Sequence, residues 1–232
     1  LPEQVTRDVV ASAFQSAGQR CSAQRMLYIQ DDVYDEMLEM IRGAFEVLEV
    51  GDPAEFSTDV GPVIDTDAKA ALERHVARRK KAGHTIWRRR LPRKLSKGCF
   101  VAPTIMELRS ISDLRRENFG PVLHVARFHS SELGQVVEDI NDMGYGLTAG
   151  LHSRLDSTRR FVEERIKVGN FYVNRNQIGA VVGSQPFGGE GLSGTGPKAG
   201  GPHYIDRFAV ERVVTIDTTA AGGNATLLAQ GS

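Results

Sequence analysis

Strand-like and helix-like segments alternate along most of this chain, and the alternation restricts the fold more than any other feature. Short apolar segments typical of strands are expected at residues 26–30, 85–87, 100–105, 122–128, 147–152 and 171–173. Segments with helical spacing are expected at residues 2–17, 33–48, 66–82, 131–143 and 155–167. Such alternation favours a mainly parallel sheet covered on both faces. The chain is therefore predicted to form a doubly wound α/β fold.

Local signals mark several of these boundaries. Asp31 and Asp32 offer side-chain oxygens that suit the N-cap of the second helix, and Gly83 is placed to end the third. The first helix opens at Pro2 with no lead-in, and its apolar face needs a partner surface. The chain is therefore expected to be a fragment or a processed piece of a longer protein.

Composition excludes several classes of function. The 29 basic and 29 acidic residues cancel, so no overall charge attracts nucleic acid or an acidic membrane. Two cysteines in 232 residues, without an apolar leader, favour a reducing and cytoplasmic location over a disulfide scaffold. No apolar run approaches the roughly 20 residues that a membrane span requires. A globular protein without a transmembrane segment is expected.

Cys21 lies in the sequence GQRCSA, between the first helix and the first strand. A loop there can present a nucleophile, and a nearby cation such as Arg20 favours the reactive thiolate. The alternative is a small buried apolar residue, which is the commoner fate of cysteine. Cys99, between Gly98 and Phe100 in an expected strand, fits that alternative. The residues by themselves leave both roles open for Cys21.

An acidic and an aromatic residue precede a turn and a strand in the segment ENFGPV, residues 117–122. The Glu117 carboxylate suits ribose hydroxyls, and the Phe119 ring suits the face of a nicotinamide. The alternative is an ordinary surface loop with a buried phenylalanine. That alternative is favoured when the segment is taken alone.

Glycines crowd residues 179–201, where the chain reads GAVVGSQPFGGEGLSGTGPKAGG. The part from Gly189 to Gly194 satisfies G-x-G-x-x-G, the pattern of dinucleotide-binding turns. That pattern must open a helix, but here it leads to Pro197, which cannot continue one. Glycines also allow backbone N–H groups to approach a ligand closely. The segment is therefore interpreted as a nest for a carboxylate and not as a phosphate-binding loop.

The basic run at residues 88–97, preceded by another at 78–81, raises the question of nucleic-acid binding. Its only interleaved aromatic residue is Trp87, and the net charge is zero, so a solvated loop is favoured. None of the six histidines has a metal-ligand spacing, and no HExxH or CxxC pattern occurs. Neither nucleic acid nor a metal ion is expected as a partner.

Three of these segments occur in an order that resembles the aldehyde dehydrogenase superfamily. Residues 18–21 resemble the G-Q-x-C around that superfamily's nucleophile, and residues 117–121 resemble its E-x-F-G-P contact with the nicotinamide ribose. Residues 186–194 resemble its P-F-G-G-x-x-x-S-G segment. Residues 51–53 and 61–64 resemble its linking motif, so the likeness runs through nearly the whole chain.

A finer resemblance is to the 1-pyrroline-5-carboxylate dehydrogenases, in particular the dehydrogenase module of bifunctional proline utilisation A proteins. Its marks are CSA, NRN, GAVVG and SGTGPKAGGP, at residues 21–23, 174–176, 179–183 and 193–202. This resemblance implies that Ser22, Gly179 and Ala180 hold the substrate's α-carboxylate, and that Phe187 packs on its aliphatic chain. The implied substrate is glutamate γ-semialdehyde, which is oxidised to glutamate in proline catabolism.

The resemblance also implies a mechanism. The Cys21 thiolate attacks the aldehyde, a hydride passes to the nicotinamide, and the resulting thioester is hydrolysed, while the backbone N–H of Cys21 forms part of the oxyanion hole. Glu117 and Phe119 would contact NAD, with NADP left open. The family's oxyanion asparagine, general-base glutamate and cofactor domain are expected upstream of Leu1. The isolated chain is therefore expected to be inactive.

Two parts of the chain are expected, a catalytic domain at residues 1–203 and an oligomerisation strand with a tail at residues 204–232. Residues 204–208 suit a helical turn, and residues 209–217 alternate like an exposed strand and resemble the family's oligomerisation arm. Residues 218–224 resemble the segment that follows this arm in the proline utilisation proteins. A homo-oligomer is expected. The alternative is a non-catalytic remnant that acts only in folding or assembly.

Overall fold

The computed structural model describes residues 1–181 and 183–217. Its α-helices are α1 (Pro2–Phe14), α2 (Tyr34–Glu46), α3 (Thr66–Lys81), α4 (Leu133–Asp142) and α5 (Asp156–Glu163). Its strands are β1 (Met26–Gln30), β2 (Ile86–Arg88), β3 (Thr104–Glu107), β4 (Val122–Phe128), β5 (Tyr145–Gly146), β6 (Thr148–Leu151), β7 (Asn170–Val173) and β8 (Glu190–Gly191). Single 3-10 turns occupy Gln15–Gly18, Asp31–Val33, Arg93–Leu95, Ile111–Asp113, Ser130–Glu132 and Ile205–Phe208.

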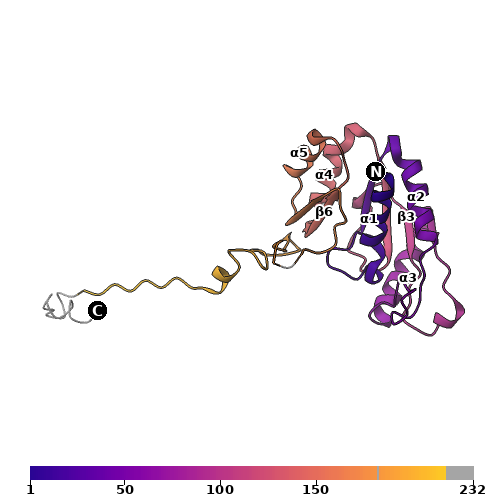
Figure 1. The fold of residues 1–232 in the computed structure, drawn as a ribbon, viewed down its shortest axis with the longest axis horizontal. Coiled ribbons are helices and arrows are strands. Elements are labelled where there is room, and N and C mark those ends of the chain that lie inside the picture. The colour runs from indigo at the N-terminus through magenta and orange to yellow at the C-terminus, as the bar shows by residue number, and fades with distance from the viewer. Residues whose placement is uncertain (182, 218–232) are drawn as a thin grey trace.

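The parallel strands fall into two units. In the larger sheet the order is β1-β4-β3-β2, with β1, β4 and β3 parallel and β2 antiparallel. The strands β6 and β7 form a separate parallel pair, and β5 and β8 form a short antiparallel pair. Figure 1 shows α4, α5 and β6 on one side of the molecule, and α1, α2, α3 and β3 on the other. The predicted mainly parallel α/β class is confirmed, but the described strands do not join into one sheet.

The main apolar core joins α1, α2 and α3 to the larger sheet. The first five residues of β4 are all buried, as a parallel strand covered on both faces requires. The helix α2 buries Met37, Ile41 and Phe45 along one side, and the Phe45 ring lies 5.4 Å from that of Phe14 in α1. The predicted apolar stripes of both helices therefore face this core.

The first helix ends earlier than the apolar spacing predicts. Ser16 and Ala17 take left-handed backbone φ values of 54° and 53°, which break the α-helix after Phe14. Ala17 is nevertheless buried, so its apolar side chain still serves the core. The bend turns the chain away from the helix axis just before Cys21, and it thereby creates the loop on which this cysteine lies.

Two other predicted boundaries are wrong for identifiable reasons. The strand expected at residues 100–105 begins only at Thr104, because Pro103 has no N–H to donate to a strand ladder. The helix expected at residues 155–167 ends at Glu163. There Asn141 of α4 donates to the Arg165 carbonyl at 2.9 Å and accepts from the Lys167 N–H at 2.8 Å. These side-chain bonds replace the helical ones.

The predicted capping of the second helix is also wrong. The residue that caps α2 is Val33, and no side chain caps either α2 or the short turn that precedes it. Asp32 instead accepts a hydrogen bond from the Gln30 amide at 2.6 Å. By contrast, Asp65 caps α3 by accepting from the Ala68 N–H, and the predicted glycine, Gly83, follows its end with a φ of 84°.

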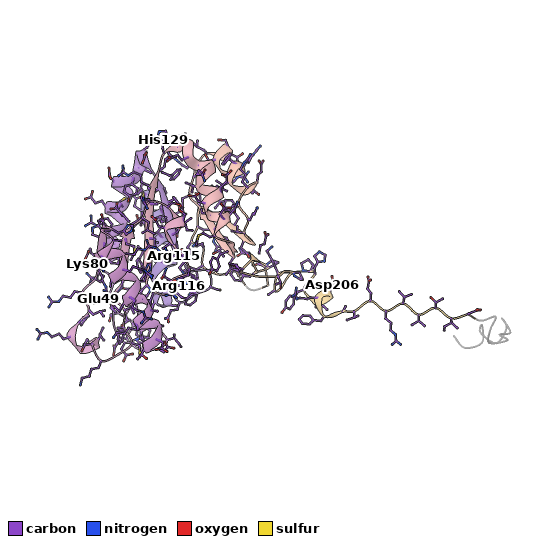
Figure 2. The ribbon with its side chains drawn as sticks, turned by 180° about the vertical axis from the view of Figure 1, so that it is seen from behind. Glu49, Lys80, Arg115, Arg116, His129 and Asp206 are labelled. Carbon is purple, nitrogen blue, oxygen red and sulfur yellow. The ribbon has the colours of Figure 1, made fainter. Side chains whose placement is uncertain are left out.

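The C-terminal part of the described chain projects away from the rest of the molecule (Figure 1). The predicted helical turn is present at Ile205–Phe208, and Asp206 in it lies well out along this segment (Figure 2). Residues 209–217 form no strand in this single chain, and Val210, Val213 and Ile216 are exposed. The predicted residues 218–224 lie outside the described part. Among the described residues, no helix is both long and apolar enough to cross a bilayer.

Candidate active site

The loop that carries Cys21 is held against the segment that carries Glu117 by two glycines. Gly18 has a φ of 63°, and a Cβ placed on it would stand 2.1 Å from the Gly120 carbonyl oxygen. Only glycine allows this approach of the two backbones. The first and second sequence motifs are therefore neighbours, although about a hundred residues separate them in the sequence. Cys21 is exposed on this loop, whereas Cys99 is partly buried against the core.

Gln19 ties the same loop to a third segment. Its side-chain amide donates to the Pro62 carbonyl at 3.2 Å and accepts from the Ile64 N–H at 2.8 Å. The segment at residues 61–64 is the one that resembles the superfamily's linking motif. Gln19 therefore holds the Cys21 loop against this third segment. These two hydrogen bonds give the glutamine two residues before the cysteine a structural role.

Arg25 lies between the Cys21 loop and the Glu117 segment. Its guanidinium donates to the carbonyls of Gly18 and Arg20, the latter at 3.0 Å, and pairs with the Glu117 carboxylate at 3.1 Å. It also stacks over the Phe119 ring, 4.6 Å from the ring centre. Burial lowers the pKa of Arg25, and Glu117 acts in the opposite direction.

Ser22 joins the Cys21 loop to the glycine-rich segment. The Gly179 N–H donates to the Ser22 hydroxyl oxygen at 2.9 Å, and Ser22 is buried. The Tyr172 hydroxyl donates to the Gly179 carbonyl at 2.7 Å, so both backbone groups of this glycine are held. Ala180 follows directly in the same loop. Two of the three residues predicted to hold a carboxylate are therefore in direct contact.

A cavity of about 310 Å³ lies between β1 and the unit formed by α4, β6 and β7. Its polar lining includes Cys21, Arg25, Glu117, Gln177 and Ser193. Cys21 and Glu117, the predicted nucleophile and cofactor residue, thus border one space. Phe119 is linked to this space through Arg25.

Other predicted site residues do not line the cavity. Ser22 lies between Cys21 and Ala23, which both line the cavity, and Gly179 lies two residues after Gln177, which also lines it. Phe187 pairs through its main chain with Ala199 and is not among the residues that line the cavity. The structure therefore places the predicted nucleophile and Glu117 on one cavity and joins Ser22 to Gly179, but it does not place Phe187 in the cavity lining.

The glycine-rich segment folds back on the smaller sheet unit and does not open a helix. Asn170 of β7 donates to the Pro186 carbonyl at 2.9 Å and accepts from the Gly188 N–H at 3.2 Å. The Ser193 hydroxyl accepts from the Gly146 N–H at 3.1 Å, and Glu190–Gly191 forms the edge strand β8. A dinucleotide-binding turn requires a helix at this point, so the structure agrees with setting that interpretation aside.

A pair of buried histidines lies behind the site, and the sequence analysis did not find it. The Nε2 atoms of His75 in α3 and His124 in β4 are 2.9 Å apart, and the His124 Nδ1 lies 2.7 Å from the Arg25 carbonyl. Burial lowers the pKa of His75 to about 4 and that of His124 to about 3. In the sequence, the signal for this pair is His124, a histidine inside the apolar run of an expected strand.

The tautomers of this pair follow from its partners. A carbonyl oxygen can only accept, so the His124 Nδ1 carries a proton and donates to Arg25. In the neutral ring the His124 Nε2 is then an acceptor, and the His75 Nε2 donates to it. Both polar ends of His124 are satisfied, which is the condition for burying it.

Two arginines of the basic run, at the end of β2 and in the loop that follows it, have carboxylate partners. Arg88 pairs with Glu73 at 2.5 Å, and Arg89 pairs with Glu46 at 3.1 Å. The short turn Arg93–Leu95 follows, with Leu95 buried. This arrangement supports the solvated-loop interpretation. Across residues 1–181 and 183–217, no group of three or more histidine, cysteine, aspartate or glutamate side chains is placed to hold a metal ion.

Comparison with known proteins identifies the family to which this fold belongs. The family model described as "Aldehyde dehydrogenase family" matches residues 2–214. The chain belongs to the aldehyde dehydrogenase family. The expected family and fold are thereby confirmed.

Within this family the chain is similar to two named kinds of protein. It is 53% identical over 217 residues to the bifunctional protein PutA of Klebsiella aerogenes, covering 91% of this chain and 16% of that protein. It is 39% identical over 205 residues to a 1-pyrroline-5-carboxylate dehydrogenase of Geobacillus sp. (strain WCH70), covering 88% of this chain and 39% of that protein. The chain therefore spans well under half the length of these relatives.

Solved structures give the same result. A crystal structure of a bifunctional proline utilization A protein superposes with a TM-score of 0.87 at 56% identity, over 95% of this chain and 22% of that one. A 1-pyrroline-5-carboxylate dehydrogenase from Thermus with bound NAD superposes with a TM-score of 0.80 at 34% identity, over 89% of this chain and 40% of that one.

Proposed function

We propose that this chain supplies the nucleophile of an NAD-dependent dehydrogenase that oxidises L-glutamate γ-semialdehyde to L-glutamate in proline catabolism. The observation that carries the proposal is the position of Cys21. It is exposed, it borders the same cavity as Glu117, and its neighbour Ser22 contacts Gly179. The names of the relatives, PutA and 1-pyrroline-5-carboxylate dehydrogenase, supply the substrate and the pathway.

In this proposal Cys21 forms the covalent bond to the substrate. Its thiolate attacks the aldehyde carbon, and the backbone N–H of Cys21 donates to the oxygen that becomes negatively charged. After oxidation, water releases the acid from the Cys21 thioester. The Arg25 guanidinium holds the loop that carries Cys21 by donating to the carbonyls of Gly18 and Arg20.

The α-carboxylate of the substrate is proposed to bind where Ser22 meets the Gly179 loop. A carboxylate there would accept from the Gly179 N–H and from the Ser22 hydroxyl, in place of the bond that now joins them. The adjacent Ala180 would complete this binding loop. Phe187, predicted to pack on the aliphatic chain, does not line the cavity and pairs through its main chain with Ala199.

The residues available for a nicotinamide nucleotide are Glu117 and Phe119. Both side chains are partly exposed, and Arg25 orients them through one ion pair and one ring contact. A carboxylate held in this way suits ribose hydroxyls, and a partly open ring suits a planar heterocycle. The nicotinamide, when bound, accepts the hydride removed from the substrate. NAD is proposed, and titration with NADP would decide between the two.

The chain is also proposed to consist of two parts. Residues 1–203 would be the catalytic domain, and residues 204–232 an oligomerisation arm with its tail. The exposed apolar side chains of Val210, Val213, Val214 and Ile216 support this proposal, because an isolated extended segment with such residues gains from pairing with a second subunit.

The test is NADH formation from glutamate γ-semialdehyde by the complete protein that carries this chain. The Cys21→Ser variant should lose this activity, whereas Cys99→Ser should keep it, because Cys99 packs against the core away from the cavity. Equal activity of Cys21→Ser and the unaltered protein would refute the proposal. The same assay on the isolated chain separates a catalytic fragment from a remnant that only folds or assembles.

A further inference from the structure

We propose that Arg25 is a positioning residue that fixes the Cys21 loop relative to the Glu117 and Phe119 side chains, and that the buried His124 anchors it. This inference rests on the proposed function for the roles of Cys21, Glu117 and Phe119. In this inference Arg25 keeps the nucleophile loop and the two proposed cofactor residues in a fixed relative position.

The guanidinium of Arg25 donates hydrogen bonds to three different acceptors. Nη1 and Nη2 donate to the carbonyls of Gly18 and Arg20, on either side of the turn that leads to Cys21. Nε donates to the Glu117 carboxylate at 3.1 Å. A planar group with five fixed donors can make these bonds simultaneously, and a lysine ammonium cannot reproduce their directions.

The flat face of the same group contacts Phe119. The guanidinium carbon lies 4.6 Å from the ring centre, within the range of a cation–π contact. The Arg25 side chain is 14% exposed, compared with 36% for Glu117. Arg25 is therefore the buried member of this group, and the partly exposed carboxylate and ring lie outward of it.

His124 anchors Arg25 through its main chain. The Arg25 carbonyl accepts from both the main-chain N–H of His124, at 3.0 Å, and the ring Nδ1, at 2.7 Å. The ring cannot turn, because its Nε2 is held by His75 in α3. The main chain of Arg25 is thus hydrogen-bonded to His124 of β4, while its guanidinium reaches the site. This attachment restricts where the guanidinium can lie.

The test compares substitutions at Arg25 with the same substitutions at a matched arginine. Arg127, also on the larger sheet, pairs with Asp35 at 2.5 Å and stacks over Tyr34 at 4.0 Å, but it does not line the cavity. The variants are Arg25→Lys, Arg25→Ala, Arg127→Lys and Arg127→Ala in the complete protein. Steady-state kcat, KM for NAD and thermal stability are measured for each variant.

Arg25→Ala is expected to lower kcat/KM by roughly a hundredfold, the loss that follows from misplacing a reacting group by about 1 Å. Arg25→Lys should lose most of the same activity because it keeps the charge but not the fork. Both variants should also raise KM for NAD, since neither side chain can hold Glu117 and Phe119 together as the guanidinium does. Added guanidinium, at a concentration that does not denature the protein, should partly restore Arg25→Ala.

Two results would overturn the inference. One is kinetics for both Arg25 variants that match those of the Arg127 variants. The other is a loss of activity that guanidinium does not reverse and that follows the loss of thermal stability, since a merely structural role predicts that pattern.

If the unaltered protein does not oxidise the aldehyde, the proposed function fails, and alkylation of the cysteines by iodoacetamide still tests Arg25. Cys99 serves as the internal reference. The alkylation rate of Cys21 relative to that of Cys99 should change in Arg25→Ala and stay unchanged in Arg127→Ala, because Arg25 holds the Gly18 and Arg20 carbonyls of the Cys21 loop. An unchanged rate for Cys21 in Arg25→Ala would overturn the inference in this case as well.

Discussion

The Gly18 backbone lies so close to Gly120 that a Cβ on Gly18 would stand 2.1 Å from the Gly120 carbonyl oxygen. This contact presses the loop before Cys21 against the segment that carries Glu117. Gly18 also has a left-handed φ of 63°. Gly18 is therefore required by the distance between two backbones, whereas a Cβ on Gly120 would stand 2.3 Å from the Leu72 side chain.

Gly18→Ala is expected to destabilise the protein and to abolish its activity. The left-handed backbone alone costs an alanine about 1–2 kcal/mol, and the contact with Gly120 must open as well. Gly43→Ala is the matched control, because Gly43 lies in α2 with nothing within 4 Å of a new Cβ. It should stabilise the protein by roughly 0.5–1 kcal/mol. Urea denaturation measures both, and a neutral Gly18→Ala would contradict the close approach.

Ser22→Ala should impair the oxidation of acidic aldehydes selectively. The Ser22 hydroxyl is the side-chain group that contacts the Gly179 N–H, so its loss removes one proposed carboxylate ligand. KM for glutamate γ-semialdehyde should rise on the order of tenfold, as expected for losing a hydrogen bond to a charged group. Oxidation of propionaldehyde, which has no carboxylate, is the control and should change little. Equal losses with both substrates would argue against a role in carboxylate binding.

Tyr172→Phe should loosen the same loop from its other side. The Tyr172 hydroxyl donates to the Gly179 carbonyl at 2.7 Å, and burial raises its pKa, so it stays a donor at neutral pH. Its removal should raise KM for the acidic aldehyde with a smaller effect on kcat. Tyr34→Phe is the control, because its hydroxyl donates to Glu107 at 2.6 Å far from the loop. Both variants should lose about 1 kcal/mol of stability, but only Tyr172→Phe should alter KM.

The free energy of unfolding should fall as the pH is lowered from about 6.5 to about 4. Burial lowers the folded-state pKa of His75 to about 4 and that of His124 to about 3, from ordinary values near 6.5. The cations Arg79, Arg78 and Arg116 lower the pKa of His75 further. For His124 the hydrogen bond to the Arg25 carbonyl raises the pKa, and the charges of His75, Arg79 and Arg25 lower it.

The sign follows from proton uptake. Below pH 6.5 the unfolded chain binds protons at both histidines and the folded chain does not, so each histidine removes up to about 1.4 kcal/mol per pH unit. The contribution is complete above pH 6.5 and is lost progressively towards the folded pKa. Urea denaturation at pH 7 and pH 4.5 measures the difference. His124→Gln, which does not titrate, should reduce this difference. A difference as large in His124→Gln as in the unaltered protein would contradict this account.

The sequence by itself determined the fold class and most of the elements. The strands at Met26–Gln30 and Val122–Phe128 were predicted to the residue, because a run of apolar residues bounded by polar or turn-forming ones is a local signal. It also indicated Cys21 and Glu117 as a pair through their motifs. The boundaries it missed depend on contacts with other elements, such as the Asn141 bonds that end α5.

The tertiary structure alone decided which residues act together. The sequence does not indicate Arg25, because no local pattern shows that its guanidinium donates to both the Gly18 carbonyl and the Glu117 carboxylate. His75 and His124 are 49 positions apart and meet only because α3 packs on β4. The spacing of apolar residues indicates which face of a helix or strand is buried, but it does not indicate which residues of another element contact that face. Pairings across the core are set by the packing of whole elements, and for this reason they appear only in the folded chain.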